Sequence, residues 1–165
     1  MDFTLTQDFA AGLDTIDAAL VDRSCLETMD QLPKIGSVEV LEQSRDGDTV
    51  RQRVRYQFMA ELSGAVRRVI DPDKLTWVED SVNNLAEHTA TYRILPDNYT
   101  KLLEGSYDAR LDAHGSGTRR TATGRLVVHV PLVGGKVERV IVAGLEENAT
   151  AQGGLIDAWL ATQPR

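Results

Sequence analysis

The closing segment of the sequence constrains the fold most. It runs without proline from Gly134 to about Thr162, and its apolar residues recur at helical spacing. A helix of roughly 28 residues is about 40 Å long at about 1.5 Å per residue, which is enough to cross a whole sheet. We therefore expect a long C-terminal helix lying on a sheet that the preceding residues form.

One stripe of this helix has an unusual composition. At about 100° per residue, the stripe that faces the sheet contains Val137, Val140, Ile141, Gly144, Leu145, Asn148, Ala151, Gln152, Leu155 and Trp159. Its ends are bulky and apolar, whereas its middle is small and polar. Because a close-packed core favours large apolar side chains and a buried amide needs partners, this middle predicts a cavity. The alternative is that Asn148 and Gln152 bond to sheet groups or reach solvent, while Gly144 admits a strand closely.

The first third of the chain contains one strand and one helical segment. Phe3, Leu5 and Phe9 point one way and the polar residues between them point the other, as in a half-buried strand. Residues 12–32 then have helical spacing, as one bent helix or two short ones, until Pro33 ends the run.

From residue 36 to about residue 131 the sequence is strand-like. Turn sequences divide it into about six strands: Asp46-Gly47-Asp48, Asp71-Pro72-Asp73, Asn83-Asn84, Pro96-Asp97-Asn98 and His114-Gly115-Ser116-Gly117. The last of these strands has an apolar face at the even positions Ala122, Gly124, Leu126, Val128 and Val130. We expect an α+β fold, with an about seven-stranded curved antiparallel sheet around the long C-terminal helix. No linker or repeat interrupts the chain, so residues 1–165 are expected to form one domain.

The charge of the chain argues against nucleic acid as a partner. The formal net charge is −7, so the overall field repels phosphate backbones. Arg51, Arg53 and Arg55 form a local basic stripe, which is more typical of the solvent face of a strand than of a binding site.

The single cysteine and the N-terminal residues indicate the cellular compartment in which the protein is expected. Cys25 has no partner for an internal disulfide, and without a nearby Cys or His it is expected to be a packed thiol. The first residues lack a basic start followed by an apolar stretch, and no apolar run is long enough to span a membrane. We expect a cytoplasmic protein.

The order of strand, helical segment, six-strand meander and closing helix resembles the START-like (SRPBCC) superfamily of helix-grip proteins. The residues Pro131-Leu-Val-Gly-Gly-Lys-Val-Glu138 are similar to the loop that leads into the closing helix of many members, and Lys74-Leu-Thr-Trp-Val-Glu79 is similar to the strand after the mid-chain loop. The whole chain resembles an actinobacterial branch. The resemblance implies a cavity between sheet and helix, which in relatives holds lipids, sterols, polyketides or plant hormones. Some relatives are cyclases or dehydratases, and others activate chaperones or act as toxins.

No catalytic motif of that superfamily can be placed on this chain. The three histidines, His88, His114 and His129, lack the spacing of a zinc site, so we expect no metal and no cofactor. His88 is the one histidine that can share a strand face with Tyr92, where the two would form a tentative acid–base pair. The alternative is a histidine that merely caps the end of the strand.

The expected ligand site combines aromatic walls with a few polar groups: Tyr56, Trp77, Tyr92, Tyr107, Gly144, Asn148 and Gln152. Each aromatic residue could equally be ordinary core. The site predicts a binding or carrier protein for a hydrophobic small molecule (lipid-, sterol- or polyketide-like), with an internal cavity of at least a few hundred Å³. One alternative is a cyclase- or dehydratase-type enzyme that uses His88 and Tyr92. Another is a module that binds a protein partner through residues 63–70.

Overall fold

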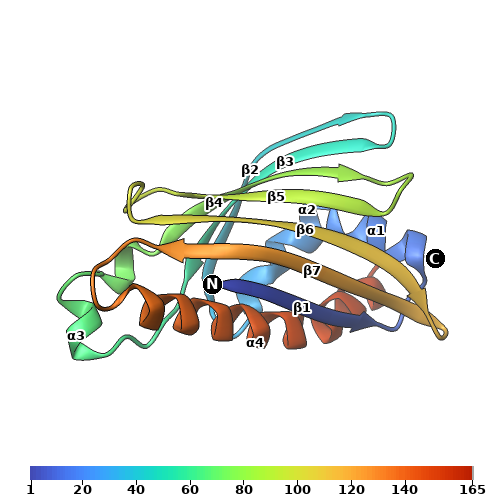
Figure 1. Cartoon of the computed structure of the whole chain (residues 1–165). Helices are drawn as coiled ribbons and strands as arrows, with labels where there is room; N and C mark the ends of the chain where they lie inside the picture. The colour runs from blue at the N-terminus through green and yellow to red at the C-terminus, as the bar shows by residue number, and fades with distance from the viewer. Residues whose placement is uncertain (165) are drawn as a thin grey trace.

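The computed structural model of the protein describes residues 1–164, which form one antiparallel sheet with helices on one side of it (Figure 1). The strands are β1 (Asp2–Phe9), β2 (Ile35–Asp46), β3 (Thr49–Phe58), β4 (Thr76–Asn84), β5 (Thr89–Pro96), β6 (Leu103–His114) and β7 (Gly117–Val128). Their order across the sheet is β1-β7-β6-β5-β4-β3-β2. The predicted fold class is therefore confirmed, including the meander and the long C-terminal helix.

The helical elements fill the two long connections and the end of the chain. They are α1 (Leu13–Leu20), α2 (Arg23–Glu27) and the 3-10 turn η1 (Thr28–Gln31) after β1, then α3 (Gly64–Arg67) and η2 (Pro72–Lys74) after β3, and finally α4 (Gly134–Ala161). The helical pattern of residues 12–32 thus becomes two short helices and a turn. Asp22 separates the two helices, because its carboxylate accepts a hydrogen bond from the Ser24 amide (2.8 Å) and so caps α2.

Helix α4 runs across the inner face of the sheet, which we define as the face that packs against it (Figure 1). Two apolar clusters hold its ends. The first surrounds Val137 and Ile141 and includes Phe3, Phe58, Val66, Ile70, Leu75, Ile94, Leu126 and Val128. The second surrounds Ile156 and includes Phe9, Ile16, Cys25, Met29, Leu32, Ile35 and Leu111. The apolar ends of the predicted stripe therefore lie where the sequence placed them.

The middle of the buried stripe differs in part from the prediction. Ala151 is exposed, whereas Ala149, Gly153 and Ile156 are buried. The helix lies so close to β1 that a Cβ added to Gly153 would be 2.7 Å from the carbonyl oxygen of Asp8. The buried face of the later part of α4 is therefore displaced around the helix relative to an ideal 100° stripe.

The segment from Ser63 to Ile70 is anchored in the first cluster. Val66 and Ile70 are buried there, while Arg67 and Arg68 are exposed. The Ser63 hydroxyl accepts a hydrogen bond from the Val66 amide and caps α3. This segment therefore contributes to the core as well as offering two exposed cationic side chains.

Gly144 and Gly154 of α4 provide a test of the helix position. A Cβ at Gly144 would overlap the ring of Phe58, whereas a Cβ at Gly154 would meet nothing within 4 Å. Overpacking costs about 1–3 kcal/mol, so we expect Gly144→Ala to lower the melting temperature by several degrees. Gly154→Ala should raise it slightly, because alanine is the better helix former by about 0.5–1 kcal/mol. Thermal unfolding of both variants by circular dichroism is the measurement; a gain from both would show that α4 does not press on Phe58.

Candidate functional site

A cavity of about 130 Å³ lies between the sheet and the middle of α4, in the space between the two apolar clusters. Its walls come from the strands of the sheet, from the helical segment between β1 and β2, and from α4. The lining residues are Phe3, Leu5, Gln7, Leu20, Leu26, Met29, Leu32, Ile35, Gln52, Tyr56, Trp77, Glu79, Tyr92, Ile94, Tyr107, Arg120, Leu145, Asn148, Ala149 and Gln152. The predicted cavity is thus present, but the predicted volume of several hundred Å³ is wrong for this conformation.

A second, apolar cavity of about 40 Å³ adjoins the first. Trp77, Ile94 and Leu145 line both and separate them. The space between sheet and helix is therefore divided by these three side chains.

Four aromatic residues form the sheet side of the cavity. Tyr92 and Tyr107 are paired across β5 and β6, and their rings stack with centroids 4.3 Å apart. Tyr56 and Trp77 are paired across β3 and β4, with ring centroids 5.7 Å apart. All four were expected in the site, and the structure brings all four to the cavity. Their flat faces provide apolar surface, while the three tyrosine hydroxyl groups can act as donors.

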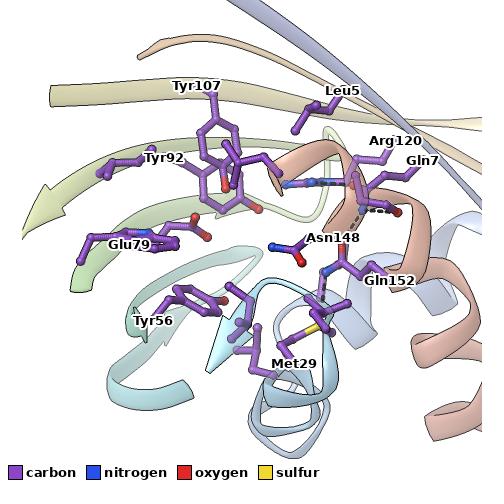
Figure 2. Close-up of a pocket in the computed structure, with 18 of the residues that line it drawn as sticks. Leu5, Gln7, Met29, Tyr56, Glu79, Tyr92, Tyr107, Arg120, Asn148 and Gln152 are labelled. Carbon is purple, nitrogen blue, oxygen red and sulfur yellow. Dashed lines mark hydrogen bonds between the residues drawn. The ribbon is translucent and has the colours of Figure 1, made fainter. Parts of the chain in front are cut away.

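The helix side of the cavity carries two amides. Asn148 is buried, and its Oδ1 accepts a hydrogen bond from the Lys34 amide (2.9 Å). This bond orients the side chain, so the Asn148 amide nitrogen is turned into the cavity (Figure 2). Gln152 accepts a hydrogen bond from Gln7 and directs its own amide nitrogen at the sulfur of Met29 (3.5 Å). Both amides were expected to line a ligand site, and both lie at the cavity.

Arg120 places a positive charge inside the cavity. Its Nη1 donates to Oε1 of Gln7 (2.8 Å), and its guanidinium lies over the ring of Tyr92, 5.4 Å from the centroid. Burial works against the charged form, but Tyr92, Tyr107 and Glu79 outweigh it and raise the pKa of Arg120 above its ordinary value. The guanidinium is therefore charged at every physiological pH.

Glu79 places a carboxyl group in the same space (Figure 2). Burial raises the pKa of this carboxyl, and the nearby Tyr107 hydroxyl and Arg120 guanidinium only partly counteract it. No ion pair joins Glu79 to Arg120 within residues 1–164. The cavity thus holds a cation and an acid that are near each other without being paired.

Gln7, Glu79 and Arg120 were missed by the sequence analysis, although strand alternation points to all three. Gln7 lies between Leu5 and Phe9 at the odd positions of β1, Glu79 is two residues after Trp77 in β4, and Arg120 is two residues before Ala122 in β7. Each one therefore faces inward by strand alternation, as the named neighbour does. They were passed over because their side chains are polar.

Two of the expected site residues lie elsewhere. Gly144 does not line the cavity; it contacts Phe58 beyond one end of it, which agrees with the alternative of close packing at a glycine. His88 precedes β5 in a turn, with a positive φ of 56°, so it does not share a strand face with Tyr92. Its Nδ1 is 2.6 Å from Oδ2 of Asp17, which ties α1 to the β4–β5 turn. His88 does not line the cavity, although it and Tyr92 both line a separate pocket of about 10 Å³. The expected pair of His88 and Tyr92 is therefore not assembled at the cavity itself.

Metal-ligating and thiol groups elsewhere in the described chain form no second site. Within residues 1–164, no three His, Cys, Asp or Glu side chains are grouped as metal ligands. Cys25 is buried in the second cluster, and burial raises the pKa of its thiol to about 12. No helix among the described residues is both long and apolar enough to cross a membrane.

Solved structures with the same fold include three that cover nearly the whole chain. The Zhui aromatase/cyclase from Streptomyces sp. R1128 is 19% identical with a TM-score of 0.67, covering 100% of this chain and 96% of that chain. TTHA0849 from Thermus thermophilus is 18% identical with a TM-score of 0.67, covering 99% and 100%. A START superfamily protein from Mycobacterium smegmatis is 17% identical with a TM-score of 0.63, covering 96% and 98%. The likeness confirms the START-like, helix-grip fold that the sequence suggested.

Sequence comparisons place the chain more narrowly. No curated protein matches it. Residues 4–160 match the family described as "Protein of unknown function (DUF2505)". Because that match extends over nearly the whole sequence, the chain belongs to the DUF2505 family.

Proposed function

We propose that the protein binds a small hydrophobic molecule that carries at least one polar group, in the cavity between the sheet and α4. The observation that carries this proposal is the polar middle of α4. Asn148 and Gln152 face a hollow lined by aromatic and aliphatic side chains, although a core built only for stability would fill that space. A mixture of apolar walls and a few fixed polar groups is typical of ligand sites.

The volume of the cavity limits the ligand in this conformation. Pockets for drug-sized molecules measure roughly 300–1,000 Å³, whereas an apolar cavity of about 150 Å³ takes up benzene. The cavity of about 130 Å³ therefore matches a single ring or a short chain. A sterol-, lipid- or polyketide-like ligand requires more space than the two cavities provide together, because about 130 Å³ and about 40 Å³ remain below the roughly 300 Å³ of drug-sized pockets.

We propose that the ligand contacts six residues expected from the sequence and three that the structure adds. The six are Tyr56, Trp77, Tyr92, Tyr107, Asn148 and Gln152, and the three are Gln7, Glu79 and Arg120. The fold supports this assignment only in a general way, since proteins with the same fold serve many functions. The arrangement of the side chains supports it more specifically, because apolar and polar surfaces meet at one place.

Filling the cavity tests the proposal. Ala149 lines the cavity, whereas Ala151 is exposed two residues further along the same helix. We expect p-cresol, a one-ring molecule with a single hydroxyl group, to bind the wild type and to shift NMR resonances of cavity residues. Ala149→Leu should weaken this binding by about tenfold or more, since a loss of about 1.4 kcal/mol already has that effect. The control variant Ala151→Leu should bind as the wild type does; equal binding by both variants would place the ligand elsewhere.

Catalysis in the same cavity is a second candidate, and Glu79 is the observation that favours it. A buried carboxyl group that keeps its proton to higher pH can act as a general acid. The neighbouring Arg120 can stabilise negative charge that develops on a substrate oxygen. This candidate replaces the tentative pair of His88 and Tyr92 with Glu79 as the acid and with Tyr92 or Tyr107 as hydroxyl partners.

The raised pKa of Glu79 can be measured through stability. The folded protein holds the Glu79 proton to higher pH than the unfolded chain does, so its stabilising effect is complete below the ordinary pKa of 4.5 and is lost as the pH rises through the raised value. Glu79→Gln cannot ionise. It should therefore melt at a higher temperature than the wild type at pH 7, and the difference should shrink towards pH 4.5.

The matched control for this measurement is Asp80→Asn. Asp80 is the next residue of β4, and its carboxylate is paired with Arg93 on the outer face (2.8 Å). Removing it should give no gain in melting temperature at pH 7. If Glu79→Gln gave no gain either, the Glu79 carboxyl would be ionised and adequately solvated, and the case for a general acid would fail.

A further inference from the structure

Among residues 1–164, Arg120 is the one arginine that lines the cavity, and it lacks a carboxylate partner there. Three arginines on the outer face are paired with carboxylates: Arg119 with Asp8 at 2.7 Å, Arg93 with Asp80 at 2.8 Å and Arg55 with Asp97 at 3.0 Å. For Arg120, no carboxylate of the described chain lies within ion-pair distance. Glu79 is near enough to interact electrostatically with the guanidinium but forms no ion pair with it. A charge held in a cavity without a direct ion-pair partner is costly, so this site favours an anionic ligand.

The groups around Arg120 are mainly donors. The guanidinium has five N–H groups, of which the Nη1 group bonds to Gln7. The Asn148 amide nitrogen is turned into the same space (Figure 2), and the Tyr92 and Tyr107 hydroxyl groups lie beside the guanidinium. Glu79 is the one acidic residue of the described chain that lines the cavity. A ligand that completes this arrangement has to bring acceptors and negative charge.

A carboxylate meets these requirements. Its two oxygens match the planar fork of a guanidinium and accept two parallel hydrogen bonds. The remaining walls of the cavity are the stacked rings of Tyr92 and Tyr107 and the side chains of Leu5, Ile94 and Leu145, which suit an apolar body.

We propose that the cavity selects a small monocarboxylic acid with one apolar ring, held by a pair between its carboxylate and Arg120 and by a hydrogen bond from Asn148. This inference rests on the proposed function and names the class of its ligand. Glu79 limits the selection to one acidic group, because a second negative charge on the ligand would lie against its carboxyl.

The test compares benzoate with benzamide, which have nearly the same shape and differ in charge. We expect the wild-type protein to bind benzoate about 10- to 100-fold more tightly, as expected for a hydrogen bond to a charged group. Isothermal titration calorimetry gives the dissociation constants, and NMR shifts at Tyr92 and Asn148 locate the site.

Three variants assign the preference to Arg120. Arg120→Gln should lose the preference for benzoate, and Arg120→Lys should restore part of it because lysine retains the charge. The matched control is Arg119→Gln, the same change at the adjacent outward-facing residue, which should bind as the wild type does. A fourth variant, Glu79→Gln, should tighten benzoate binding and leave benzamide unchanged at a pH at which the Glu79 carboxyl of the wild type is ionised, because only the ionised carboxyl repels the ligand.

The outcomes separate this inference from the proposed function. Equal affinity for benzoate and benzamide, with both in the cavity, would overturn the inference and leave the proposed function standing. Absence of binding by benzoate, benzamide and p-cresol would contradict both. If Arg120→Gln fails to fold, the wild type still decides, because equal affinity for benzoate and benzamide, or NMR shifts that place benzoate away from Tyr92 and Asn148, would contradict the inference.

Discussion

The packing of both ends of α4 into apolar clusters is the constraint on which the rest of the structure depends. Val137 and Ile141 are buried in one apolar cluster and Ile156 in the other, so the helix spans the distance between them as a rod. A continuous helix cannot bend its middle sharply towards the sheet without disrupting backbone hydrogen bonds. The space under that middle therefore persists, and the side chains that face it decide what it can hold.

Gln7 connects that space to the helix. It accepts from Arg120 (2.8 Å), donates to the carbonyl oxygen of Ala149 (3.3 Å) and donates to Gln152. One side chain on β1 thus joins the charged residue of β7 to two positions on α4. Hydrogen bonds in such a chain polarise one another, so the bonds of Gln7 couple the guanidinium of Arg120 to the middle of α4.

Strand alternation predicted the architecture well. It also indicates inward-facing polar residues of the site that a search for hydrophobic residues does not find. The strands and the polar middle of α4 follow from periods of two and 3.6 residues, which depend only on local geometry, and from the turn sequences between strands. Glu79 and Arg120 obey the same alternation and were missed because charged residues were assumed to face solvent. The turn conformation of His88 and the contact between Gly144 and Phe58 could not be predicted in this way. They depend on how closely α4 approaches the sheet and on a positive φ at one residue, and neither leaves a periodic signal.

The composition of the cavity is difficult to explain by stability alone. Apolar residues of similar size at positions 79 and 120 would pack against the tyrosine rings without the desolvation of two ionisable groups, and such replacements of buried charges are often neutral or stabilising. The burial that raises the pKa of Glu79 is itself a measure of that unfavourable desolvation. Proteins tend to keep such costly groups where a ligand or a reaction uses them. The cavity therefore combines an unpaired cation, a protonatable acid and an amide that faces inward. Binding of a ligand explains this combination better than the folding of the chain does.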